Sequence, residues 1–220
     1  MKFNLKPNGR TLKHHFSYHW WQYALIIVLS FAVWNLIYTQ TEYRAPGERR
    51  IDLYVQTAGV ISEEGIEALQ AMGERASSEV EEVNMMTILP AEAQDLYAGV
   101  QLVTYLSARE GDIYVLASED FKRFAAQGAF MPLDGEEVPL DIQAEELKAG
   151  YIRAMELQED GTEKPAAQSR LYGIPLAGYP GAARMLGLSR SDVFLSVPYY
   201  CDNPESTLAF INALLKEENL

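Results

Sequence analysis

The longest apolar stretch of the chain is WWQYALIIVLSFAVWNLIYTQT, residues 20–41, which contains no Asp, Glu, Lys or Arg. Between Tyr23 and Tyr38 only Ser30 and Asn35 interrupt the apolar residues. A helix needs about 20 mostly apolar residues to cross the hydrocarbon of a bilayer, and aromatic residues favour both of its interfaces. The pattern therefore predicts a transmembrane helix over residues 20–41. A buried core helix and a cleaved signal peptide are the alternatives, but the TQTEYR that follows Tyr38 lacks a small-residue cleavage site.

After residue 50 the apolar pattern changes to short β-rich runs that alternate with stretches of helical spacing. The predicted strands are residues 51–56, 83–89, 112–116, 171–176 and 192–197. The predicted helices are residues 62–76, 91–109, 118–127 and 203–215. Strands that alternate with helices in this way form βαβ units, which place helices on both faces of a parallel sheet. The sequence therefore predicts an α/β fold, with an N-terminal transmembrane helix followed by a single three-layer domain that has a mostly parallel sheet.

Local signals mark where the helices begin. Ser62, Ser118 and Asn203 are predicted N-caps, because Ser and Asn side chains accept hydrogen bonds from the first free N–H groups of a helix. Pro204 stands at the first helical position. A backbone N–H at this position has no partner within the helix, so its absence in proline costs no hydrogen bond.

Residues 135–170 break the alternation of strands and helices. A short helix is predicted around residues 144–148, and residues 151–157 are predicted to pair with residues 169–176 as antiparallel strands. Residues 164–168 are expected to form a loop. The sequence leaves open whether this segment folds back as a hairpin or forms the stub of a second lobe.

The charges orient the chain. Four of the 18 basic residues precede the apolar stretch, whereas all 31 acidic residues follow it. Loops rich in Lys and Arg stay in the cytoplasm. The sequence therefore predicts a basic cytoplasmic tail over residues 1–19, the membrane span over 20–41, a linker over 42–50 and an acidic extracellular domain over 51–220. The expected location is the cell membrane, with a single pass and a cytoplasmic N-terminus.

Patterns that carry catalysis or metal binding are sparse. The three His residues are His14, His15 and His19, which do not share one helix face, so the predicted extracellular domain has no His for a triad or a metal site. The single cysteine, Cys201, excludes a disulfide framework within the chain and is expected to be a packing residue, with pairing between chains as the alternative. We expect no catalytic residue, metal, cofactor or enzyme activity. The acidic domain argues against nucleic acid as a partner.

The predicted sheet itself offers a place for a ligand. In open parallel sheets, ligands bind beyond the carboxyl ends of the strands. Gln56, Thr57, Ser118 and Glu119 lie at those ends and supply polar donors and acceptors. We predict that these four residues form a ligand-binding site, and the alternative for Ser118 is a purely capping role. The GYPG at residues 178–181 lacks the Lys and the spacing of a phosphate loop and is expected to be a turn.

Two stretches of the domain carry motifs of a known family: GDIYVLASEDFKRFAAQGAFMPLD, residues 111–134, and LYGIPLAG, residues 171–178. Both resemble segments of the extracellular solute-binding proteins of bacterial ABC importers, and residues 51–59 and the helix that begins at Asn203 have counterparts there. The resemblance implies a fold like one lobe of a type 2 periplasmic binding protein. Family members have two lobes around a ligand cleft, and they usually carry a cleaved signal or a lipid-bearing cysteine.

We therefore expect a membrane-anchored binding module that presents a small solute or a peptide to a membrane transporter. The alternative is a structural or regulatory accessory of a membrane protein complex without a small-molecule ligand, in which Asn35 adds a helix–helix contact inside the bilayer. The expected partners are the bilayer, through residues 20–41, and a transporter or another membrane protein. Ligand-induced stabilisation would favour the first interpretation, and co-purification of a membrane partner would favour the second.

Overall fold

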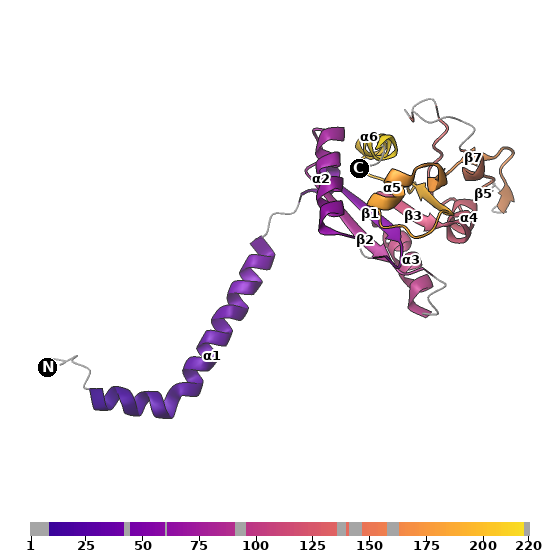
Figure 1. Ribbon diagram of the computed structural model, residues 1–220. Helices are drawn as coiled ribbons and strands as arrows, with labels where there is room; N and C mark the ends of the chain where they lie inside the picture. Colours follow the sequence, from indigo (N-terminus) through magenta and orange to yellow (C-terminus); the bar gives the residue numbers. More distant parts are fainter. Residues whose placement is uncertain are drawn as a thin grey trace. The chain divides into compact units, whose positions relative to one another are not determined.

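The structure is a computed structural model that describes residues 9–41, 45–59, 61–90, 96–135, 140, 147–157 and 163–217. It divides into two compact units, Met1–Arg44 and Ala45–Leu220. The first unit contains helix α1, and the second contains an α/β domain (Figure 1).

Helix α1 runs from Gly9 to Thr41 and contains 33 residues. At a rise of 1.5 Å per residue it is about 50 Å long, which exceeds the hydrocarbon thickness of about 30 Å. In the part of the chain that the structure describes, Trp20–Thr39 is the one helical segment long and apolar enough to cross a membrane, and its side chains are exposed. The helix therefore begins before the predicted span and continues through it.

The described residues of the second unit form a five-stranded sheet in the order β2-β1-β3-β9-β8. Its strands are β1 (Arg50–Gln56), β2 (Glu82–Ile88), β3 (Ile113–Ala117), β8 (Ile174–Pro175) and β9 (Val193–Ser196). Strand β1 is parallel to β2 and β3, whereas β9 is antiparallel to β3 and β8 is antiparallel to β9. Only β9 opposes the common direction, which confirms the predicted α/β fold with a mostly parallel sheet.

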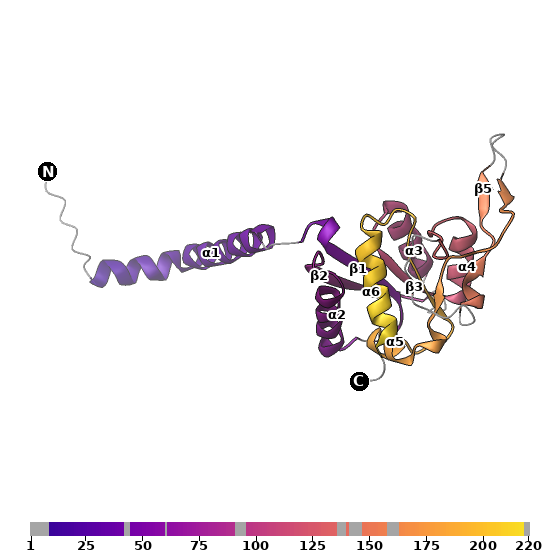
Figure 2. The ribbon, with the colours of Figure 1, turned by 90° about the horizontal axis from the view of Figure 1, so that it is seen from above.

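Helices cover both faces of this sheet (Figure 2). They are α2 (Glu63–Ala76), α3 (Leu96–Ala108), α4 (Ser118–Ala126), α5 (Pro180–Met185) and α6 (Pro204–Lys216). Side chains of neighbouring residues on a strand point to opposite faces. Leu53 of β1 belongs to a core cluster with buried residues of α2 and α6, and its neighbour Tyr54 belongs to a second cluster with buried residues of α3 and α4. The domain therefore has the predicted three layers.

Capping residues fix the starts of α2 and α6 as the sequence predicts. The Ser62 hydroxyl accepts a hydrogen bond from Gly65 N at 3.1 Å. The side-chain oxygen of Asn203 accepts one from Ser206 N at 3.2 Å, and Pro204 is the first residue of α6. These local signals could be found from the sequence because each cap bonds to a residue only three positions away.

The segment before β8 forms two short antiparallel ladders outside the main sheet. Strand β4 (Tyr151–Ile152) pairs with β7 (Arg170–Leu171), and β5 (Met155–Leu157) pairs with β6 (Glu163–Pro165). The predicted pairing of residues 151–157 with 169–176 is correct for β4 and β7 but wrong for β5, whose partner β6 overlaps the predicted loop over 164–168. The helix predicted around residues 144–148 lies mostly outside the described residues, and Lys148–Gly150 forms a 3-10 turn, η3.

The outer edge of β2 borders no other strand among the described residues. Gln70 of α2 covers the start of this edge. Its side-chain nitrogen donates to Glu81 O at 2.9 Å, and its side-chain oxygen accepts from Val83 N at 2.7 Å. A neighbouring strand would offer the same donor and acceptor, so a side chain stands in for a strand at this point.

Candidate binding groove at the carboxyl edge of the sheet

A groove of about 340 Å³ lies between the amino-terminal end of α2 and helix α5. This volume falls within the range of about 300–1,000 Å³ that is usual for small-molecule sites. The lining residues come from the β1–α2 connection, α2, α5 and the positions after α5 and α6: Ile61, Ser62, Glu64, Gly65, Ala68, Gly181, Arg184, Met185, Gly187 and Glu217. The groove therefore lies beyond the carboxyl end of β1, the edge at which the sequence predicts a ligand.

The wall of the groove is held by contacts just after β1. The Thr57 hydroxyl donates to Gly187 O at 3.0 Å and accepts from Gly59 N at 3.0 Å. At Gly59 a Cβ atom would lie 2.5 Å from Gly187 O, which is too close for any other residue. The chain after α5 is therefore fastened to the loop between β1 and α2, and this contact sets the position of α5 beside α2.

The groove combines apolar and charged side chains. Gly65 of α2 lies beside α5, where a Cβ atom would be 3.4 Å from Met185 O, an ordinary contact distance. Glu64 and Glu217 supply negative charge, and Arg184 supplies positive charge. Such a mixture of an apolar lining with a few charged groups suits a small polar or zwitterionic ligand.

Gln56 is buried and bridges two elements of the sheet. Its side-chain nitrogen donates to Asp120 Oδ2 at 2.7 Å, and its side-chain oxygen accepts from Ala117 N at 2.9 Å. Asp120 also forms an ion pair with Arg123 at 2.7 Å. Gln56 therefore ties the end of β1 to the junction of β3 and α4, and both the nitrogen and the oxygen of its side-chain amide are hydrogen-bonded within the fold.

The other two predicted site residues begin α4. The N-cap of α4 is Ala117 and no side chain caps the helix, so the predicted capping role of Ser118 is wrong. Ser118 N instead donates to Asp192 O at 2.9 Å, which ties α4 to the chain before β9. Glu119 is exposed in the first turn. The structure thus brings Gln56 to the β3–α4 junction and Thr57 to the groove wall, and the four-residue ligand site stays a prediction.

Sequence reasoning missed the contribution of α5 to the groove. Residues 178–181 were expected to form a plain turn, whereas α5 begins at Pro180 and places Arg184 and Met185 at the groove. Proline at the first helical position is the signal that could have revealed this helix. Its contact with α2 could not have been found locally, because Thr57 and Gly187 are 130 positions apart.

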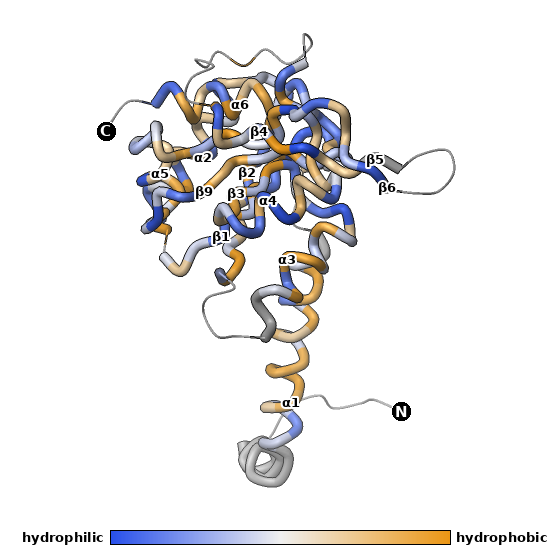
Figure 3. The backbone as a smooth tube through the Cα atoms, turned by 90° about the vertical axis from the view of Figure 1, so that its right-hand side faces the viewer, coloured by the Kyte–Doolittle hydropathy of each residue, from blue (hydrophilic) through white to orange (hydrophobic). Residues whose placement is uncertain are grey.

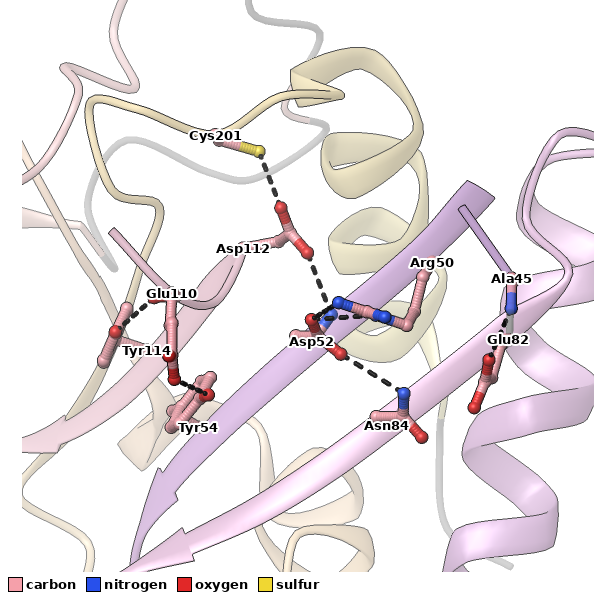
Figure 4. Close-up of polar contacts among 10 residues, drawn as sticks. All are labelled: Ala45, Arg50, Asp52, Tyr54, Glu82, Asn84, Glu110, Asp112, Tyr114 and Cys201. Atoms are coloured by element: carbon pink, nitrogen blue, oxygen red, sulfur yellow. Dashed lines mark hydrogen bonds and ion pairs between the residues drawn. The ribbon is translucent and has the colours of Figure 1, made fainter. Parts of the chain in front are cut away.

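A second polar cluster surrounds the starts of β1 and β3 (Figure 4). Asp52 pairs with Arg50 at 2.7 Å and accepts a hydrogen bond from Asn84 at 3.3 Å. Asp52 N donates to Asp112 Oδ2 at 2.9 Å. These bonds tie β1 to β2 and to the residue before β3, so the polar groups of this cluster hold the strands of the sheet together.

Cys201 lies beside this cluster. Its thiol donates to Asp112 Oδ1 at 3.6 Å and lies 3.5 Å from Thr207 Oγ1. Burial raises the pKa of the Cys201 thiol to about 11, and burial also raises the pKa of Asp112. A thiol with this pKa stays protonated at neutral pH and is a poor nucleophile. Among the described residues no group of three His, Cys, Asp or Glu side chains could hold a metal ion.

Three tyrosines converge on Glu110 in the turn between α3 and β3. Tyr54 Oη donates to Glu110 Oε2 at 3.2 Å, and the hydroxyls of Tyr114 and Tyr200 donate to Glu110 O. Burial raises the pKa of Tyr200 to about 12 and raises the pKa of Tyr54 and Tyr114 as well. All three stay neutral donors at physiological pH and hold the turn in place.

The comparisons with known proteins give partial matches to solved structures. No protein-family model matches the sequence, and no curated protein matches it. A family 1 extracellular solute-binding protein from Alicyclobacillus acidocaldarius is 17% identical, with a TM-score of 0.37, over 64% of this chain and 34% of its own. An ABC substrate-binding protein from Listeria monocytogenes, in complex with cycloalternan, is 18% identical, with a TM-score of 0.36, over 56% of this chain and 28% of its own.

An enzyme also appears among the similar structures. Thiaminase I from Bacillus thiaminolyticus is 16% identical, with a TM-score of 0.32, over 57% of this chain and 28% of its own. The chain thus spans about a third of the length of the solved proteins that it matches. The solved structures to which this chain is similar in part thus include extracellular solute-binding proteins, the family that the sequence motifs resemble.

Proposed function

We propose that the protein is a single-pass membrane protein whose extracytoplasmic domain binds a small solute or a short peptide and serves an ABC transporter. The observation that carries the proposal is the combination of an exposed, charge-free helix, Trp20–Thr39, with a separate compact domain that holds a groove of about 340 Å³. The sequence motifs that resemble solute-binding proteins suggest the transporter as partner. Gln56, Thr57, Ser118 and Glu119, at the same edge of the sheet as the groove, belong to the proposed site.

The orientation follows from the basic residues before the span, which favour a cytoplasmic N-terminus. Cysteine labelling in intact cells tests it. In a Cys201→Ser background, Ser78→Cys is expected to react with a membrane-impermeant maleimide, because Ser78 is exposed in the domain. Asn4→Cys, in the tail before α1, is expected to react only after the membrane is permeabilised. The reverse pattern would place the domain in the cytoplasm and refute the proposal.

Ligand binding is tested by thermal unfolding of the full chain in lipid nanodiscs against sugars, amino acids, short peptides and anions. A ligand at one hundred times its dissociation constant adds about 2.7 kcal/mol to the free energy of unfolding. Ala68→Phe fills the groove and is expected to abolish the shift, whereas Ala71→Phe, exposed on the same helix and outside the lining, is expected to preserve it. A shift that survives Ala68→Phe would place the ligand elsewhere.

A second candidate function is that of an accessory subunit of a membrane protein complex. Helix α3 favours it, because its sequence LYAGVQLVTYLSA contains no charged residue and is coloured largely hydrophobic in Figure 3. Its residues Val100 and Val103 are 62% and 46% exposed. Purification of the full chain from membranes in mild detergent tests this function. A stoichiometric partner that is lost on Val100→Glu, without any ligand for the groove, would favour the accessory function.

A further inference from the structure

Helix α1 carries an amide inside its apolar span. Asn35 lies four residues before the end of Trp20–Thr39, which is about 6 Å inside the span at 1.5 Å per residue. The Thr39 hydroxyl donates to the main-chain oxygen of Asn35 at 2.8 Å and is satisfied within its own helix. The side-chain amide of Asn35 makes no hydrogen bond with any described residue. Unpaired amides in hydrocarbon are costly, so this group needs a partner from outside the helix.

The surface of α1 is hollowed at the same place. Ala32, Asn35, Leu36 and Thr39 line an open hollow on the helix. Their spacing of i, i+3, i+4 and i+7 is that of the four residues that surround a hole in knobs-into-holes packing. Ala32 and Thr39 are small, and small residues let two helices approach closely in a bilayer. The hollow therefore suits the side chain of a second helix.

We propose that a second copy of the same helix occupies this hollow, in a parallel dimer in which the two Asn35 side chains bond to each other. An amide has both a donor and an acceptor, so an identical amide satisfies both groups at once. Copies of a single-pass protein insert in the same direction, which puts both Asn35 residues at the same depth. A different protein would need its own polar group at that depth. This inference rests on the membrane span of the proposed function.

Energy transfer between labelled copies tests the dimer. Full-length chain, labelled with donor or acceptor at the amino terminus, is reconstituted together in phosphatidylcholine vesicles at several protein-to-lipid ratios. Transfer above the level of random proximity, falling as lipid is added, is expected. Asn35→Leu is expected to weaken the association roughly tenfold, because it removes the amide pair, whereas Asn35→Gln keeps an amide and is expected to preserve most of it. Ser30→Ala is the control, since Ser30 lies about 140° around the helix from Asn35.

The possible outcomes distinguish a failure of the proposed dimer from a failure of the proposed membrane anchor. Flotation with the vesicles is measured first, and a chain that does not float refutes the anchor and with it the dimer. A chain that floats but gives only random transfer refutes the dimer and leaves the anchor intact. Transfer that is unchanged in Asn35→Leu also overturns the proposal, because the contact then lies on another face of α1.

Discussion

Buried polar residues in this domain form hydrogen bonds between distant elements, and their positions in the sequence do not reveal these bonds. Gln56 stands at the end of a strand, where the sequence suggests a ligand contact, yet both groups of its side-chain amide bond to Asp120 and Ala117. Asp120 is 64 positions away. The role of Gln56 could therefore be found only from the structure, which brings the end of β1 to the start of α4.

Replacing Gln56 tests this role. Gln56→Ala leaves Ala117 N and Asp120 Oδ2 without these partners in a buried place, and the expected cost is about 1–3 kcal/mol of unfolding free energy. The measurement is urea unfolding of the full chain in detergent micelles, followed by the near-ultraviolet circular dichroism of the tyrosines. Gln127→Ala, at an exposed glutamine, is the control and is expected to change stability by less than about 0.5 kcal/mol. Equal effects of the two variants would contradict the bridging role.

Cys201 offers a second measurement at the scale of one residue, because it is the single cysteine of the chain. Its pKa is raised by burial from 9.0 to about 11, so its reaction with Ellman's reagent at pH 8 is expected to be roughly a hundredfold slower in the folded chain than in urea. The folded state also holds the thiol proton more tightly than the unfolded state, so stability is expected to fall as the pH rises from about 9 to about 11. A folded chain that reacts as fast as the unfolded one would refute the buried, protonated thiol.

At the scale of elements, the groove depends on the contact between the β1–α2 loop and the chain after α5. Gly59 makes this contact, since a Cβ atom there would clash with Gly187 O. Gly178, in the 3-10 turn before α5 (η4, Leu176–Gly178), has open space around its Cβ position. The two glycines therefore form a matched pair for mutation.

Gly59→Ala is expected to destabilise the domain by about 1–3 kcal/mol, because the added methyl must push α5 away from α2. Gly178→Ala is expected to be neutral or to stabilise by up to about 1 kcal/mol, because it restricts the unfolded chain without a clash. Thermal unfolding of both variants in nanodiscs measures the difference. If Gly59→Ala melts like the wild type, the α2–α5 contact does not hold the groove as described.

The elements that the sequence predicts well are those with local signals. Strand β3 is a continuous apolar run and β1 and β2 are short β-rich runs, and α2 and α6 begin at caps that bond three residues ahead. The direction of β9 and the pairing of β5 with β6 were not predicted, because they depend on which strand lies alongside in space. The groove residue Arg184 was missed for the same reason: α5 is placed beside α2 by the distant contact of Gly187, just after α5, with Thr57 and Gly59.

At the scale of the whole molecule, the chain consists of two units with different surfaces. Helix α1 exposes apolar side chains from Trp20 to Thr39, whereas the domain has its own buried core on both faces of the sheet. All three tryptophans, Trp20, Trp21 and Trp34, belong to α1. Tryptophan emission therefore reports on the helix and tyrosine signals report mainly on the domain.

This division leads to a prediction about unfolding. In vesicles, urea that abolishes the near-ultraviolet tyrosine signal is expected to leave the tryptophan emission maximum unchanged, because the proposed membrane span would keep α1 in the bilayer. Lipids brominated on their acyl chains are expected to quench the same emission. Tryptophan emission that shifts together with the tyrosine signal, or that resists quenching, would show that α1 is not held by the membrane.

The proposed membrane anchor gives the Gln70 side chain a further consequence, because it would bring many copies of the domain together on one surface. Domains tethered to the same surface meet often, and an open strand edge invites neighbouring copies to join their sheets into a growing ribbon. The Gln70 side chain already occupies the first bonding position on the edge of β2, through Glu81 and Val83. An incoming strand would have to displace it before pairing from the start of β2. The Gln70 side chain thereby disfavours edge-to-edge pairing of β2 strands between neighbouring domains.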